Sequence, residues 1–198
     1  MRILLDIVFF IILGYFCSRF AQVLLKMRQK IIFPVTNEEV TSIRKHLDKV
    51  LDVPTYSKQK VGIIIYFVML LFVVVVYFLG VYFDVFTFSF SFLLILPFTY
   101  SFDVLNLFAF TEDGVLSGVR FIKWNKIKSF QFIPIEVNHK FYVFSKEANH
   151  GYELKMTTTG IPIRCVVTSE EMKERVKILL GTYLKDSSKN VQKGRIAE

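Results

Sequence analysis

The chain has 198 residues, of which 53% are apolar, 16% aromatic and 21% charged, and its net charge is +8. An average soluble domain is less apolar and more charged, and 22 Phe residues exclude a disordered or collagen-like chain. The two cysteines, Cys17 and Cys165, lie in segments that are not expected to meet. This excludes a disulfide framework and a cysteine-based zinc site. The composition therefore predicts a small integral membrane protein.

Three apolar stretches are candidate membrane spans, since about 20 apolar residues cross the hydrocarbon core. They are residues 3–25, 61–83 and 85–102, with Asp84 as the single charge between the last two. We expect a first transmembrane helix within residues 1–25 and a transmembrane helical hairpin within residues 61–104. A cleaved signal peptide is the alternative for the first stretch. Its apolar core is longer than the usual 7–15 residues and no small-x-small cleavage site follows, which favours the uncleaved helix.

The basic residues predict the orientation. Residues 26–60 carry eight of them, whereas the opposite side of the membrane has only Arg2. Because basic loops stay in the cytoplasm, we expect the N-terminus outside and residues 26–60 inside. Three crossings then place the C-terminal part of the chain in the cytoplasm.

The cytoplasmic loop, residues 26–60, contains a helix signal. Thr36 and Glu39 have the spacing of a capping box. After them, apolar residues recur at helical spacing with cations between them, until Pro54 ends the pattern; the apolar residues are Val40, Ile43, Leu47, Val50 and Leu51, and the cations are Arg44, Lys45 and Lys49. We expect a basic amphipathic helix. It either lies on the inner leaflet or packs against the C-terminal domain.

Residues 105–185 have the pattern of a small antiparallel β domain. LNLFAF and VLSGVRFI flank the turn sequence Asp113-Gly114, and HKFYVFS, YELKMTT and GIPIRCVVT are further expected strands. A capping box at Thr168 and Glu171 opens a helix with one apolar face, formed by Met172, Val176, Leu179, Leu180, Tyr183 and Leu184. Residues 186–198 are charged, and we expect a disordered tail.

The order of these elements resembles the bacterial pleckstrin-homology-like (PH-like) domains that occur beside transmembrane helices in Gram-positive bacteria. The residues that carry the resemblance are Glu112, Gly114, Trp124 and Ile127, followed by the C-terminal helix. The resemblance implies an α+β membrane protein: three transmembrane helices, then a cytoplasmic PH-like antiparallel β domain with a C-terminal helix. It also implies a bacterial cell membrane as the location, and structural roles for Gly114, Trp124 and Ile127. It implies no activity.

The sequence offers no arrangement for chemistry. His46, His139 and His150 have no partners at metal-ligand spacing, and no phosphate-binding glycine loop is present. Cys165 lies in an apolar strand pattern, as a buried hydrophobe would. The spans lack a central charge, which argues against a transporter. We therefore expect no catalytic residue, no metal and no cofactor.

The remaining candidate site is basic. Arg120, Lys123, Lys126 and Lys128 cluster around Trp124, and Arg44, Lys45 and Lys49 lie in the loop. Anionic lipid of the inner leaflet, a protein partner or nucleic acid could bind such a cluster, and the alternative that the basic pattern itself favours is a solvated cytoplasmic face that follows the positive-inside rule. We expect a non-enzymatic module that binds a partner protein or anionic lipid there. The family resemblance adds an alternative, self-immunity against a bacteriocin.

Overall fold

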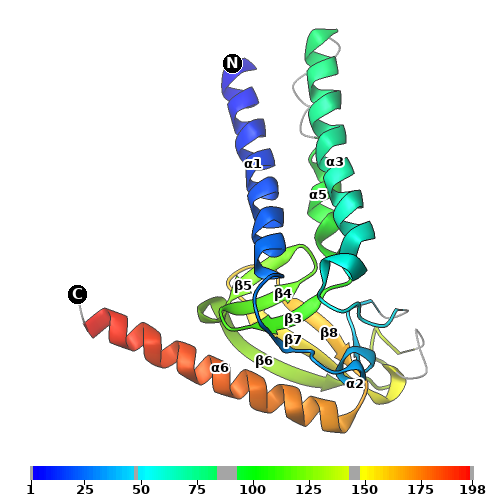
Figure 1. Ribbon diagram of the computed structural model, residues 1–198, viewed down its shortest axis with the longest axis vertical. Coiled ribbons are helices and arrows are strands. Elements are labelled where there is room, and N and C mark those ends of the chain that lie inside the picture. Colours follow the sequence, from blue (N-terminus) through cyan, green and yellow to red (C-terminus); the bar gives the residue numbers. More distant parts are fainter. Residues whose placement is uncertain (1, 47–48, 84–92, 143–147, 197–198) are drawn as a thin grey trace.

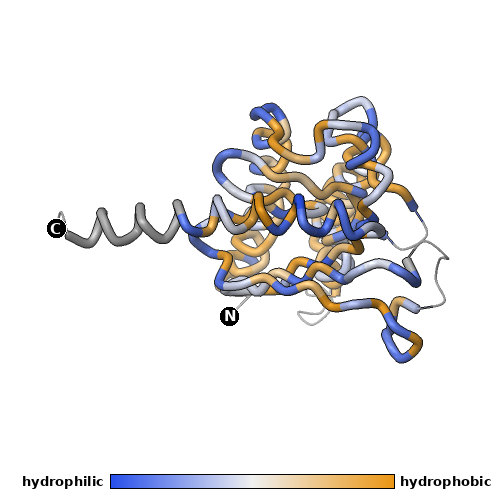
Figure 2. Tube along the Cα trace, turned by 90° about the horizontal axis from the view of Figure 1, so that it is seen from below, coloured by the Kyte–Doolittle hydropathy of each residue, from blue (hydrophilic) through white to orange (hydrophobic). Residues whose placement is uncertain are grey.

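The computed structural model describes residues 2–46, 49–83, 93–142 and 148–196. Two long helices stand side by side at one end of the molecule, two four-stranded antiparallel sheets follow, and the C-terminal helix covers the opposite side (Figure 1). The chain is therefore an α+β protein. Viewed along the long helices, the C-terminal helix lies across the β domain (Figure 2).

The two long helices are α1 (Arg2–Lys26) and α3 (Tyr56–Tyr82). Both are long and apolar enough to cross a membrane, which agrees with the first two predicted stretches. They contact each other through aromatic rings: Phe9 stacks on Tyr77 and Phe20 on Tyr66, each with 4.4 Å between ring centroids. Only 22% of each apolar window is buried, so most of their apolar side chains face outward.

The third predicted span differs from the expectation. Residues 84–92 lie outside the described residues, and residues 93–103 contain the short helix α5 (Leu96–Tyr100) and a 3-10 turn, Ser101–Asp103. Five helical residues rise only about 7.5 Å, so the described part of this segment is not one continuous spanning helix. Pro97 lies at the start of α5, where its missing N–H group and its ring prevent an uninterrupted helix from continuing through it.

The first sheet has the order β1-β3-β4-β5. Its strands are β1 (Ile31–Phe33), β3 (Phe108–Thr111), β4 (Gly114–Ser117) and β5 (Arg120–Lys123). The segment VLSGVRFI, expected as one strand, is two strands, because Gly118 adopts φ +57° and turns the chain between them. This left-handed backbone favours glycine.

Alternate residues of the first sheet enter two different cores. Phe108, Phe110, Val115 and Ile122 face the interior of the β domain; Leu107, Ala109, Leu116 and Phe121 pack instead against α1, α3 and α5. Successive side chains of a strand point to opposite faces, so both faces of this sheet are covered. The β domain is thus packed directly onto the helix pair.

The second sheet has the order β2-β8-β7-β6. Its strands are β2 (Ile43–Arg44), β6 (Ile127–Pro134), β7 (Tyr152–Thr158) and β8 (Ile163–Val167). One face, with Leu154, Met156 and Cys165, belongs to the core of the β domain. The strand expected at HKFYVFS is not seen: residues 139–142 form turns, and residues 143–147 lie outside the described part of the chain.

The loop of residues 26–60 also differs from the prediction. The capping box of Thr36 and Glu39 is confirmed, but its helix α2 (Asn37–Thr41) has only five residues. Ile43 and Arg44 then pair with Val167 and Val166 as an edge strand, so the long amphipathic helix is wrong. Sheet pairing satisfies these backbone groups and buries Ile43 completely, which a continued helix would not do. Residues 47–48 lie outside the description.

The loop also changes the domain boundary. It supplies β1 to one sheet and β2 to the other, so the β domain includes residues 31–44 as well as residues 105–185. Strands of three and two residues are too short for a periodic pattern, and their pairing partners are distant in sequence.

The C-terminal helix α6 (Glu170–Ile196) buries the predicted apolar face. Met172, Val176 and Leu180 are buried in the core, with the other three predicted residues packed against it. Its first turn differs in one detail: the Ser169 hydroxyl accepts from the Met172 amide, while Thr168 donates to the Ser42 carbonyl. The N-cap is therefore Ser169, and the capping box expected at Thr168 and Glu171 is wrong. Residues 186–196 continue the helix where a disordered tail was expected.

Candidate functional site

The structure separates the seven predicted basic residues. Arg44 is the last residue of strand β2, and Lys45 comes directly after it. The Lys45 side chain is buried, and its Nζ atom lies 3.0 Å from the Asp103 carboxylate. Lys49 is exposed outside any helix or strand. These three cations therefore do not form the single face that an amphipathic helix would give. Lys128 is exposed on β6.

The other three predicted residues line one cavity. Arg120, Lys123 and Lys126 meet Arg19 and Gln22 of α1 across a space of about 430 Å³. The turn between β7 and β8, residues 158–161, forms the remaining wall together with Asn125. The cavity therefore lies where the end of a long apolar helix meets the edge of the first sheet. We call it the interfacial basic cavity.

Arg120 is the most buried cation of this cavity. Its residue is 6% exposed, its Nη1 atom donates to the Ile161 carbonyl at 3.2 Å, and its guanidinium lies 5.0 Å from the Phe102 ring centroid. Its Nε atom is buried and has no hydrogen-bond partner among the described residues. Burial lowers the pKa of Arg120 from its ordinary value, Asp103 opposes this shift, and the charge of Arg19 adds to it. The group still carries its charge at neutral pH.

Arg19 comes from the opposite wall. Its Nε atom donates to the Tyr15 hydroxyl at 3.1 Å, and its Nη1 atom lies 3.5 Å from the Phe121 carbonyl oxygen. These contacts hold the guanidinium against β5, 102 residues away in the sequence. Arg19 lies in the first apolar stretch and is not among the seven basic residues predicted for the site. No local pattern links two residues so far apart.

All charged side chains of the described lining are cationic. Arg19, Arg120, Lys123 and Lys126 contribute four positive charges, and none of the described residues that line the cavity is acidic. Like charges held together in a partly buried space repel one another, and an anion between them relieves that repulsion. The arrangement is suited to binding an oxyanion.

A second cavity on the other side of Arg120 has mixed charge. It is lined by Lys45, Asp103 and Arg164, among others. Lys45 pairs with Asp103, and Arg164 pairs with Glu153 at 3.5 Å. These cations are already balanced by carboxylates, so this cavity offers an anion less than the interfacial basic cavity does.

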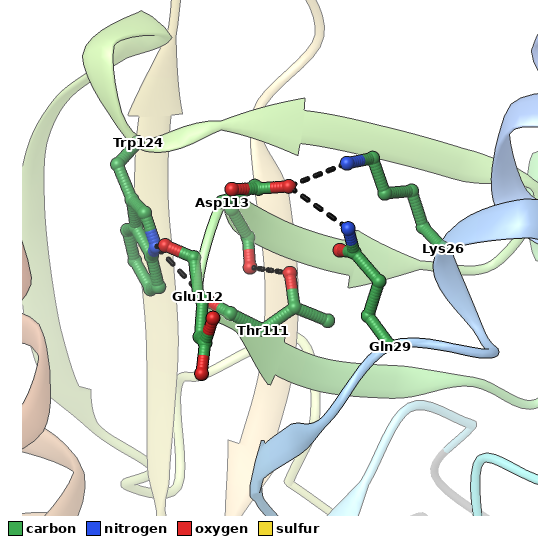
Figure 3. A network of polar contacts seen from close by, with 7 residues as sticks. Lys26, Gln29, Thr111, Glu112, Asp113 and Trp124 are labelled. Carbon is green, nitrogen blue, oxygen red and sulfur yellow. Dashed lines mark hydrogen bonds and ion pairs between the residues drawn. The ribbon is translucent and has the colours of Figure 1, made fainter.

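The turn that contains Gly114, one of the residues expected to be structural, holds Trp124 and connects the end of α1 to the first sheet through Asp113 (Figure 3). The Trp124 Nε1 atom donates to the Thr111 and Glu112 carbonyls, both at 3.1 Å. In the same turn the Asp113 carboxylate accepts from Lys26 at 2.5 Å and from Gln29 at 3.0 Å. A Cβ atom on Gly114 would lie 2.2 Å from the Ile122 carbonyl oxygen.

Trp124 and Ile127 pack in the core of the β domain. Trp124 is 6% exposed and stacks on Tyr183 of α6, and Ile127 is also buried in the core. The Glu112-Asp113-Gly114 turn and Trp124 are thus the point at which α1, the first sheet and α6 meet.

His46 and His139 make local polar contacts, and Cys165 is buried in the core. His46 lies 2.9 Å from the Asp103 carbonyl oxygen, and His139 lies 2.9 Å from the Glu153 carboxylate. Burial raises the pKa of the Cys165 thiol to about 12, so this thiol is protonated at neutral pH and is a poor nucleophile. His150 lines a separate shallow cavity beside residues 134–138.

Comparisons with known proteins returned no match: no protein-family model, no curated protein and no solved structure matches this chain. The function therefore has to be argued from the site itself.

Proposed function

We propose that this chain is a non-enzymatic membrane protein that holds its β domain on the inner leaflet and binds anionic phospholipid there. In this proposal the chain crosses the bilayer three times, with its N-terminus outside and its C-terminus in the cytoplasm of a bacterial cell. The PH-like character of the β domain is part of the proposal.

The exposed apolar surface of the helices supports membrane insertion. Large side chains along α3 are well exposed, among them Phe67, Phe72 and Phe78 at 60%, 61% and 57%. Water would make such rows of exposed aromatic groups unfavourable, whereas hydrocarbon accommodates them. A core helix of a soluble protein would have most of this surface buried.

The path of the chain supports an odd number of crossings. α1 runs toward the sheets and α3 runs away from them (Figure 1). Phe98 of α5 then contacts Phe16 and Tyr66, at 5.2 and 5.7 Å between ring centroids, so the chain has returned to the sheet side before β3. Together with the basic loop of residues 26–60, this favours a cytoplasmic β domain.

The place of the interfacial basic cavity is the observation that carries the lipid proposal. Arg19 lies seven residues before the end of α1, about 10 Å along the helix axis, and it faces Arg120 of the docked sheet. Cations at this level meet phosphate headgroups, each contributing about 1 kcal/mol near an anionic leaflet. The bilayer beside α1 would also keep a nucleic acid duplex away, which favours lipid over nucleic acid.

Two experiments test the proposal. A reporter fused after Glu198 should be active only in the cytoplasm, and one inserted at Asp84 only outside.

The purified full-length chain in neutral detergent should melt at a higher temperature as phosphatidylglycerol is added, because a ligand of the native state stabilises it. Phosphatidylcholine is the matched lipid control. Equal melting temperatures with both lipids at every mole fraction would overturn the lipid proposal.

A further inference from the structure

We infer that the interfacial basic cavity is a discrete site for one phosphate group, that of a single anionic phospholipid. This inference rests on the proposed function and sharpens it, because a diffuse attraction to the leaflet needs only exposed lysines. A site requires convergent, partly buried donors, and the cavity provides them.

Arg120 is the anchor of the proposed site. A guanidinium that is 6% exposed and has a buried Nε atom without a partner in the described chain has lost its hydration without full compensation. Asp103, the carboxylate whose charge acts on Arg120, lies outside the lining of this cavity and is paired with Lys45. A phosphate oxygen against the accessible edge of this guanidinium would supply the negative charge that the lining lacks.

Arg19 gives the site its second wall, and two lysines lie on the same side of the cavity as Arg120. Arg19 is already held by Tyr15 and the Phe121 carbonyl, so little side-chain entropy remains to be lost when an anion binds. Lys123 and Lys126 are exposed at the rim, and the amides of Gln22 and Asn125 add neutral donors. A volume of about 430 Å³ lies within the usual range of small-ligand sites.

The surroundings favour a lipid as the source of the phosphate. Along the same helix, Tyr15 and Leu25 are 53% and 64% exposed, so apolar surface flanks Arg19 and Gln22. An acyl chain could lie along this surface while its headgroup occupies the cavity. A soluble phosphate ester would gain nothing from it.

The test counts bound ligands on the full-length chain in neutral detergent by native mass spectrometry. Short-chain phosphatidylglycerol should bind as one saturable copy, more tightly than phosphatidylcholine, glycerol phosphate or inorganic phosphate. Arg19→Gln, Lys126→Gln and Gly160→Glu should each weaken this binding about tenfold or more, since each removes or opposes a charged contact. Gly160 belongs to the lining and an added Cβ atom there would meet nothing within 4 Å, so the substitution brings a carboxylate to the cavity from a position with open space.

Lys128→Gln is the matched control. It removes the same charge two residues from Lys126, at a side chain outside the cavity lining, and should leave the affinity unchanged. Arg120→Gln should abolish the saturable copy, and Arg120→Lys should restore part of it. If Arg120→Gln does not fold, the Arg19, Lys126 and Gly160 variants still decide the matter.

The outcomes separate this inference from the proposed function. Stabilisation by phosphatidylglycerol without a saturable copy, or with equal affinity in the Arg19, Lys126, Gly160 and Lys128 variants, would overturn the site and leave the lipid function standing. Inorganic phosphate binding as tightly as phosphatidylglycerol would overturn the lipid as the source. Absence of any effect of phosphatidylglycerol would overturn both proposals.

Discussion

The two sheets of the β domain differ in what covers them. The first sheet is buried on both faces, and every residue of β3 and β4 is buried. In the second sheet one face joins the core, whereas β6 has exposed or half-buried residues at every position after Ile127. The first sheet therefore connects the apolar helices to the β domain, and the second sheet completes the core and faces outward.

This difference shows how the interfacial basic cavity is formed. Arg120 and Lys123 belong to β5, the edge strand of the sheet that contacts α1, so docking of that sheet brings them to Arg19. A β domain tethered only by a linker would not hold these side chains at a fixed distance. The site depends on the packing between the helices and the first sheet.

The largest expected effect comes from charging the face of the first sheet that contacts the helices. Ala109 is fully buried in the core shared with α1 and α3, so Ala109→Asp would bury an unpaired carboxylate at a cost of several kcal/mol. Total stabilities are only about 5–15 kcal/mol, so we expect the full-length chain in detergent to lose its cooperative melting. Gln131→Asp, exposed on β6, is the control and should melt like the parent. Equal behaviour of the two variants would mean that the helices do not pack on this sheet.

The next effect concerns the corner between the sheets. Trp124 lies between β5 and β6 and contacts Phe110 and Tyr183, so Trp124→Ala should cost about 3–5 kcal/mol. The full-length chain is the sample, because residues 105–185 alone lack β1 and β2. Thermal melting measures the loss. Trp124→Phe, which removes the two Nε1 hydrogen bonds and keeps a ring, should cost about 1 kcal/mol. Unchanged melting of the Ala variant would contradict the observed burial.

The contrast between the sheets also explains what could be predicted from the sequence. The apolar face of α6, the two long helices and the Asp113-Gly114 hairpin all follow from local periodicity or turn chemistry, and the structure has them. In the segment LNLFAF, the four residues 107–110 are all apolar. Such a pattern is typical of a strand covered on both faces, which is what the structure shows for Leu107 to Phe110.

The features that were missed depend on distant pairing. Ile43 and Arg44 fit a helical pattern locally, and only their partners Val166 and Val167 make them a strand. A glycine inside an apolar run is compatible with one long strand or with two short ones. The positive φ of Gly118 and its close approach to the Phe102 backbone, which separate the two strands, are not visible in the sequence. Arg19 and Arg120 come together only when the first sheet docks on α1. Local sequence patterns carry no record of such contacts.

An intermediate effect on stability is expected from a comparison of two glycines, one in a turn of each sheet. Gly118 turns the chain between β4 and β5 with φ +57°, and an added Cβ atom would lie 1.8 Å from the Phe102 carbonyl oxygen. Gly118→Ala should therefore cost at least about 1–2 kcal/mol from the left-handed backbone alone. Gly160 lies between β7 and β8 with open space around it, so Gly160→Ala should change the stability by less than about 1 kcal/mol in either direction. Melting of the two full-length variants measures the difference, and equal losses would contradict the tight approach at Gly118.

The smallest effect is that of the ion pair between α1 and the first sheet. Hydrogen bonds from Lys26 and Gln29, and then the charge of Lys26, lower the pKa of Asp113 from its ordinary value. A lowered pKa in the folded state means that the stabilisation is present above the unfolded pKa of about 3.9, and that it is lost as the pH falls through the folded value. The Asp113 side chain is 49% exposed, so screening by solvent keeps the contribution below about 1 kcal/mol.

Asp113→Asn should therefore lower the melting temperature slightly at pH 7 in low salt, and the difference from the parent should shrink in 1 M salt, where the Debye length is about 3 Å. The difference should also shrink as the pH falls below about 4, because the parent then loses the same charge. Glu174→Gln provides the control, since its partner Lys177 lies on the same helix and does not connect α1 to the β domain. A difference that persists in high salt would show that Asp113 ties α1 to the first sheet through its hydrogen bonds rather than its charge. In that case the contact at Asp113 would resemble the apolar contacts of Ala109 in one respect, because salt does not screen either of them.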